Sequence, residues 1–181
     1  MGLTEREIRR MIREIIIERM SGFPRVHNMM TGNVDSINTI GMMTSENPMA
    51  QQLTHKENKK RLSDLKEDLR NLNLGFIPID GTYGVKENAL VIPNIKREDL
   101  INLGEKYKQD SVIFGQKKND NGKIVFLWEF IKRGDVVKTS NIVITNSEAL
   151  ETADDFYSAI KNRRFAIPFD DVSITNNFIT D

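Results

Sequence analysis

The chain lacks cysteine altogether and has only two histidines, His27 and His55, among its 181 residues. Disulfides, thiol nucleophiles and cysteine-ligated zinc or iron–sulfur centres are therefore excluded. Two histidines cannot supply a three-histidine metal site, and no Ser–His–Asp arrangement can be argued from the residues around them. We therefore expect no metal and no cofactor, and the composition favours a non-catalytic protein over an enzyme.

The sequence also has no excess of basic over acidic residues and no long apolar run. The 26 basic and 26 acidic residues give a formal net charge of +0. Broad nucleic-acid binding needs a surplus of Lys and Arg, so this balance argues against a nucleic-acid partner. No apolar run approaches the ~20 residues that span a bilayer, and no secretory signal pattern is visible. We expect no membrane association and a cytoplasmic protein, globular because 39% of its residues are hydrophobic.

Residues 4–20 carry the strongest helical pattern. Thr4 and Glu7 form a capping box. Apolar side chains then recur on one face at spacings of three and four: Ile8, Met11, Ile12, Ile15 and Ile16. An isolated helix of this length is marginal in water, so the stripe packs either on its own domain or on a partner. Residues 21–35, rich in Gly, Asn, Pro and Met, indicate a linker or extended segment. The sequence therefore predicts an amphipathic arm at 1–35 and a single domain at 36–181.

Strand and helix patterns alternate through residues 36–181. We expect strands at 37–43, 76–79, 89–92, 111–114, 123–131, 136–145 and 165–169. We expect helices at 54–73, which Thr54 and Glu57 cap and Gly75 ends, at 97–107 and at 154–161. Residues 80–84 indicate a tight loop, and residues 119–122 a hairpin turn that favours antiparallel pairing. These patterns predict an α+β fold, in which a mixed or largely antiparallel sheet is covered by helices on one face.

Four polar side chains are candidates for chemistry. Asn47 follows the first expected strand, together with Ser45, and loops at strand ends often carry ligand contacts, although ordinary turn chemistry explains the same residues. Arg61, near a helix N-terminus, could hold an anion; the alternative is a solvated ion pair with Glu57. Glu87, at the start of a strand, could act as an acid or base, but spacing identifies no partner carboxylate.

Several short motifs in this region follow one another in a fixed order. They are Thr44-Ser45-Glu46-Asn47-Pro48, Glu57-Asn58-x-x-Arg61, Leu74-Gly75-Phe76, Glu87-Asn88-Ala89-Leu90-Val91 and Tyr107-Lys108-Gln109. Together they resemble an uncharacterised bacterial and bacteriophage family with a Ser-Ala-x-Asn-Pro loop, a Glu-Asn-x-x-Arg helix and a Phe-Gly-Gln segment. The resemblance covers about residues 36–116, and this chain departs from it at Lys108, where the family has glycine. It implies a fold and a bacterial or phage origin, but no reaction.

Two functions are consistent with these observations. The first is a phage-type, non-catalytic binding or assembly protein, virion-associated or accessory, that docks on a protein partner or on itself through helix 4–20. It would reside in the host cytoplasm or the virion. The alternative is a small enzyme or nucleotide-binding module of phage–host conflict, with an anion site around Arg61, Glu87 as base, and Asn47, Asn58 and Gln109 orienting the ligand. This alternative predicts that the five side chains converge on one pocket.

Overall fold

The computed structural model describes Thr4, Glu5 and residues 22–83, 85–145, 156–160 and 163–171. Apart from its first two residues, the expected helix 4–20 lies outside this part of the chain, and so do its stripe residues Ile8, Met11, Ile12, Ile15 and Ile16. The docking function assigned to that helix therefore stays a prediction.

A nine-stranded antiparallel sheet dominates the described residues, in the order β8-β7-β2-β3-β1-β4-β5-β6-β9. Its strands are β1 (Thr39–Thr44), β2 (Ile77–Tyr83), β3 (Val85–Pro93), β4 (Ser111–Asp120), β5 (Lys123–Lys132), β6 (Asp135–Ser140), β7 (Phe156–Ile160), β8 (Arg163–Phe165) and β9 (Asp170–Asp171). The helices are α2 (Phe23–Met30), the short 3-10 helix η1 (Pro48–Ala50), α3 (His55–Asn71) and α4 (Arg97–Lys106). The expected α+β class and the antiparallel sheet are confirmed.

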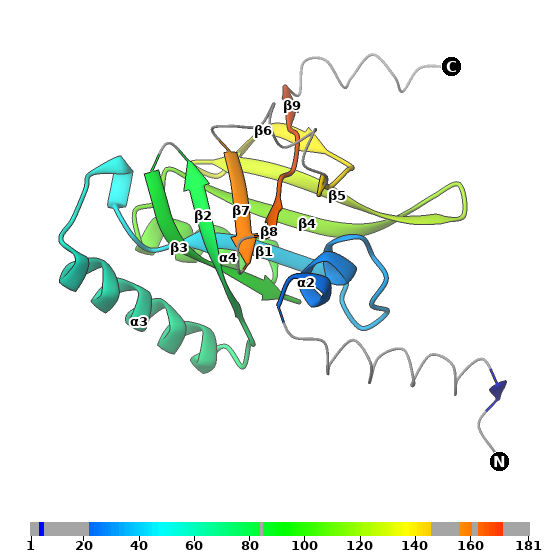
Figure 1. Ribbon diagram of the computed structural model, residues 1–181, viewed down its shortest axis with the longest axis horizontal. Coiled ribbons are helices and arrows are strands. Elements are labelled where there is room, and N and C mark those ends of the chain that lie inside the picture. Colours follow the sequence, from blue (N-terminus) through cyan, green and yellow to red (C-terminus); the bar gives the residue numbers. More distant parts are fainter. Residues whose placement is uncertain (1–3, 6–21, 84, 146–155, 161–162, 172–181) are drawn as a thin grey trace.

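The sheet curls into a half-barrel, and one short segment connects its two ends. Residues 163–171 pair with β7 through β8 and with β6 through β9. Between these pairings, Ala166 forms a bridge with Ile144. Figure 1 shows this segment, coloured orange to red, crossing in front of the central strands. The segment therefore passes over the inner, concave face of the sheet, where Phe165 and Ile167 join the apolar core.

The two faces of the sheet carry separate apolar cores. On the outer face, Leu65 and Leu69 of α3 and Leu100 of α4 pack with strand residues such as Leu90 and Ile92. On the concave face, α2 packs with Met42, Val91, Phe126, Trp128 and Phe165. Neighbouring residues of one strand, such as Val91 and Ile92, belong to opposite cores because successive side chains of a strand point to opposite faces.

Two glycines permit close packing on these faces. A Cβ atom at Gly41 of β1 would lie 2.7 Å from Ile95 Cγ2 and 2.9 Å from Leu100 Cδ1, so the absence of a side chain lets α4 approach the sheet. A Cβ atom at Gly115 of β4 would lie 2.5 Å from the ring of Trp128, its cross-strand partner. Trp128 is fully buried, which confirms the buried face expected from the alternation in residues 123–131.

The prediction of a linker at residues 21–35 is wrong for residues 23–30, which form α2. Phe23, Val26, Met29 and Met30 recur at helical spacing and are buried in the concave core. The residues interpreted as helix breakers stand at the helix start: Gly22 is the N-cap, and the proline falls in the first turn, where its missing N–H costs nothing. Because α2 lies on the face opposite α3 and α4, the expectation of helices on one face is also wrong.

The expected helix at 154–161 is wrong as well, because residues 156–160 form β7. Its pairing with β2 and β8 satisfies the main chain, and a short apolar run cannot by itself distinguish strand from helix. The expected loop at 80–84 is mostly strand, since β2 and β3 remain paired up to Tyr83 and Val85. Past the end of α3, Asn73 rather than Gly75 adopts a left-handed conformation, with φ 56°. The Thr54–Glu57 capping box and the hairpin turn at 119–122 are confirmed.

Candidate functional site

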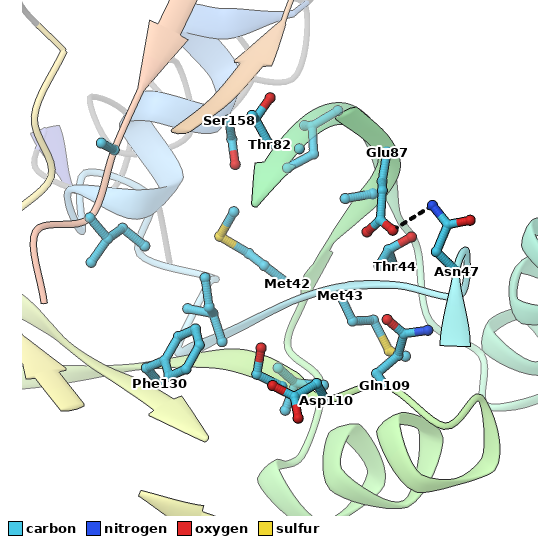
Figure 2. Close-up of a pocket in the computed structure, with 18 of the residues that line it drawn as sticks. Met42, Met43, Thr44, Asn47, Thr82, Glu87, Gln109, Asp110, Phe130 and Ser158 are labelled. Carbon is cyan, nitrogen blue, oxygen red and sulfur yellow. Dashed lines mark hydrogen bonds between the residues drawn. The ribbon is translucent and has the colours of Figure 1, made fainter. Parts of the chain in front are cut away.

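A cavity of about 230 Å³ lies on the concave face of the half-barrel (Figure 2). Its apolar lining is Met42, Met43, Ala50, Ile79, Gly81, Ala89, Val112, Ile113, Phe130, Phe165, Ala166, Ile167 and Phe169. Its polar lining is Thr44, Asn47, Gln52, Thr82, Glu87, Gln109, Asp110, Ser111 and Ser158. Pockets for drug-sized ligands measure roughly 300–1,000 Å³, whereas a cavity of about 150 Å³ holds benzene. The cavity therefore suits a small molecule somewhat larger than a single aromatic ring.

Asn47 connects the loop after β1 to α3 and to the cavity. Its backbone is left-handed, with φ 42°, a conformation that Asn tolerates better than most residues. Its Oδ1 accepts hydrogen bonds from the Leu53 N–H at 3.1 Å and from Asn58 Nδ2 at 2.8 Å. Its own N–H donates to Asn58 Oδ1 at 3.0 Å. The remaining group, Nδ2, donates to Glu87 Oε1 at 2.8 Å, so the amide fixes the position of a carboxylate in the cavity.

Arg61 and Gln109 hold the main chain of the same loop. Arg61 Nε donates to the Ser45 carbonyl at 2.6 Å, and its Nη2 donates to the Tyr107 carbonyl. Gln109 Nε2 donates to the Glu46 carbonyl at 3.0 Å. Arg61 is not among the residues that line the cavity. Its guanidinium therefore connects two main-chain carbonyls, those of Ser45 and Tyr107. The anion site around Arg61 stays a prediction.

Glu87 is the carboxylate whose protonation the site perturbs. Burial raises the pKa of Glu87, the neighbouring negative charge of Glu46 raises that pKa further, and the hydrogen bond from Asn47 opposes both. The Glu46 carboxylate is buried and accepts hydrogen bonds from the Asn88 N–H at 3.0 Å and from Asn88 Nδ2 at 2.8 Å. The fold thus keeps two acidic side chains close together, and only one of them lines the cavity.

The remaining acidic side chain of the lining, Asp110, is paired with cations. Its Oδ2 lies 3.0 Å from Lys132 Nζ, and its Oδ1 lies 4.0 Å from an Arg133 nitrogen. Figure 2 shows Asp110 beside Gln109, on a different side of the cavity from Glu87. Glu87, in contrast, has the Asn47 amide as its hydrogen-bond partner among the described residues. The uncompensated negative charge in the cavity is therefore that of Glu87.

The structure brings all five predicted side chains to the loop after β1. Asn47, Glu87 and Gln109 line the cavity, while Asn58 and Arg61 support the loop from α3 without lining it. Ser45, a second candidate for ligand contact, is fully buried, and its Oγ has no hydrogen-bond partner in the described residues.

Several residues of the site cannot be predicted from their local sequence. Glu46 is one of them, because its position beside Glu87 depends on how β1 and β3 pair. Thr44 of β1 pairs with Ala89 of β3, and this register brings the residues after β1 beside those that precede Ala89. Thr82, Phe130 and Ser158 come from three further strands, and nothing in their local sequence marks them. The register between β1 and β3 is the one signal that could have found Glu46.

Within the described residues, no group of three His, Asp or Glu side chains could hold a metal ion. No helix in that same part of the chain is long and apolar enough to cross a membrane.

A family model matches the part of the chain that contains most of this site. Residues 43–112 match the model of a family described as "Protein of unknown function (DUF3293)". This match confirms the resemblance to an uncharacterised family, while the phage origin and the motif pattern stay predictions. The matched residues include Asn47, Asn58, Arg61, Glu87 and Gln109. No curated protein matches the chain.

Proposed function

We propose that this protein binds a small, largely apolar molecule in the cavity of its half-barrel, and that Glu87 contacts the polar part of that molecule. One observation carries the proposal: among the described residues, a cavity with mostly apolar walls contains one carboxylate without a cationic partner, and an amide holds that carboxylate in place. Ligand pockets combine these two elements, apolar walls for affinity and a few positioned polar groups for orientation.

The free-energy cost of burying the ionised Glu87 carboxylate supports a functional role for this residue. Its raised pKa means that the folded protein disfavours the charged form, so the carboxylate reduces stability at neutral pH. A carboxyl group in a cleft whose pKa is raised by burial and by a neighbouring charge is a candidate for ligand contact. The hydrogen bonds of Asn47 fix the carboxylate before any ligand arrives, which lowers the ordering cost of binding.

The proposal is tested by titrating the ¹⁵N-labelled full chain with 2-phenylethanol, a neutral molecule of suitable size. We expect saturable shifts of amide signals from Thr44, Thr82 and Ser158, which line the cavity on three different strands. Ile113→Trp fills the cavity and should abolish these shifts. Lys118→Trp, at an exposed position on the same strand, should retain them.

Circular dichroism establishes that both variants are folded, and Ser158→Leu replaces Ile113→Trp if the latter fails to fold. The proposal is wrong if the wild-type chain shows no saturable shifts. It is equally wrong if a folded, cavity-filled variant responds as the wild type does.

A second candidate function rests on the apolar stripe expected in residues 4–20. We propose that this segment docks on a protein partner or on a second copy of the chain, because an amphipathic helix must bury its apolar face. Deletion of residues 1–20 should then abolish pull-down of the partner or reduce the mass measured by light scattering. Unchanged interactions and mass in the deletion variant would end this proposal.

A further inference from the structure

The electrostatic character of the cavity restricts the ligands that it accepts. Among the described residues that line it, Glu87 and Asp110 are the charged ones, and neither lysine, arginine nor histidine contributes. Asp110 is compensated outside the cavity by Lys132. An anionic ligand would therefore face the Glu87 carboxylate without a cation to balance its own charge, and burying such a charge unpaired is costly.

The surroundings of Glu87 add to the negative potential at that side of the cavity. Glu46 lies close enough for its charge to disfavour ionisation of Glu87. Both oxygens of Glu46 accept hydrogen bonds from Asn88, so this neighbour is fixed in place. Asn47 is a neutral donor and leaves the charge of Glu87 uncompensated. A cation placed beside Glu87 would be attracted by both carboxylates.

The opposite side of the cavity suits an apolar group. Figure 2 shows Glu87, Thr44 and Asn47 together on one side and Phe130 across from them. The rings of Phe130 and Phe169 meet edge to face, with centroids 5.6 Å apart. Phe165 and Ile167 also belong to the apolar lining of the cavity. The cavity thus has a carboxylate at one side and aromatic side chains at the other.

We propose that the ligand is a small primary amine, bound as its ammonium ion at Glu87, with an aromatic or branched apolar group against Phe130 and Phe169. This inference rests on the proposed function, because it assigns the chemical class of the molecule bound in the same cavity. A charge-assisted hydrogen bond between ammonium and carboxylate is about twice as strong as a neutral one, and it orients the ligand. The cavity of about 230 Å³ accommodates a ring with a short aminoalkyl chain.

Calorimetric titration of the full chain with three probes of nearly equal shape tests the inference. The probes are phenethylamine, 2-phenylethanol and 3-phenylpropionate, which differ mainly in the charge of the polar end. We expect phenethylamine to bind about tenfold more tightly than the alcohol, because the ionic hydrogen bond replaces a neutral one. The carboxylate probe should bind more weakly than both.

Two charge-removing variants give the matched comparison. Glu87→Gln keeps the shape of the side chain and should bring the amine and the alcohol within about twofold of one another. Asp80→Asn removes a carboxylate from the same hairpin, but Asp80 is paired with Lys86 outside the cavity and should leave the tenfold preference unchanged.

The outcomes separate this inference from the proposed function. Equal binding of amine and alcohol to the wild type, or an undiminished amine preference in Glu87→Gln, would overturn the amine assignment while leaving the cavity as a binding site. Tighter binding of 3-phenylpropionate than of phenethylamine would also overturn it. If none of the three probes binds, the proposed function itself fails.

Discussion

Replacing Asn47 by Asp tests whether the contact between Asn47 and Glu87 organises the cavity. The substitution keeps Oδ1 as acceptor for the Leu53 N–H and Asn58 Nδ2, and Asp tolerates the left-handed backbone much as Asn does. It changes one contact, because the Nδ2 that donates to Glu87 Oε1 at 2.8 Å becomes a carboxylate oxygen.

The size of the effect follows from that contact. A hydrogen bond to a charged group contributes about 1.5–3 kcal/mol, and Asn47→Asp removes one. Two unit charges roughly 4 Å apart repel by about 4 kcal/mol at an effective dielectric constant of 20, which is a ceiling because the pair can share a proton. We expect Asn47→Asp to lower the free energy of unfolding by about 2–4 kcal/mol at neutral pH.

A double-mutant cycle isolates the interaction. In Asn47→Asp combined with Glu87→Gln, the Gln amide can donate to the new Asp, so the double variant should recover at least ~1.5 kcal/mol relative to the sum of the single effects. Urea unfolding at constant pH gives all four free energies. If the single effects add to within about 0.5 kcal/mol, the two side chains are not coupled and the reasoning about the site is refuted.

Three further variants probe the same region. Glu87→Gln alone should stabilise the protein at neutral pH: the native pKa of Glu87 lies above its ordinary 4.5, so the unfolded chain ionises first as pH rises and the wild type loses stability. This gain should vanish at about pH 3, where the carboxyl is protonated in both states, and a gain independent of pH in urea unfolding would contradict the account. Lys108 has φ 53°, a left-handed conformation that glycine adopts without the steric cost of a Cβ atom. Lys108→Gly should therefore raise the free energy of unfolding by about 1 kcal/mol, whereas Lys108→Ala should leave it unchanged, and equal melting temperatures for the two variants would refute this. Ser45→Ala removes a buried hydroxyl that has no hydrogen-bond partner among the described residues, so it should leave the free energy of unfolding unchanged or raise it by up to about 1 kcal/mol; a clear loss of stability in thermal unfolding would show that the hydroxyl has a partner.

Local signals predict the regular elements of this fold well. The capping box of Thr54 and Glu57 fixes the start of α3, because it satisfies donors that the helix leaves free. At the predicted hairpin turn, residues 119–122, Asn121 and Gly122 have φ 50° and 83°, the left-handed conformations that a tight hairpin requires. The alternation around Trp128 assigns β5 and its buried face.

Elements that depend on distant partners were not predictable in this way. The strand character of β7 comes from its pairing with β2, about 75 residues earlier in the chain. Gly22 and Pro24 suggest a break in the chain at residues 23–30, yet packing in the concave core stabilises a helix there. Tertiary contacts override local propensity in both segments.

The candidate site shows the same division. Asn47, Glu87 and Gln109 were predicted from short motifs. Asn47 and Glu87 meet because β1 and β3 pair in one particular register, and Gln109 reaches the same loop through its hydrogen bond to the Glu46 carbonyl. Glu46 reaches the cavity region through the register between β1 and β3, and Phe130 reaches it through the curl of the sheet. Neither feature can be predicted from the local pattern of one sequence. Motifs therefore marked part of the polar side of the cavity, and its aromatic side required the fold.

The central claim, that the cavity holds a small molecule, is tested most directly by intermolecular nuclear Overhauser effects to a methyl-labelled full chain. With 2-phenylethanol in saturating amount, we predict effects from the probe to methyl groups of Met42, Ile79 and Ile113, which line the cavity. Ile95 and Leu65, in the core on the other face of the sheet, should show none. Effects confined to exposed apolar residues such as Ile142 would contradict the account, and so would the absence of any effect.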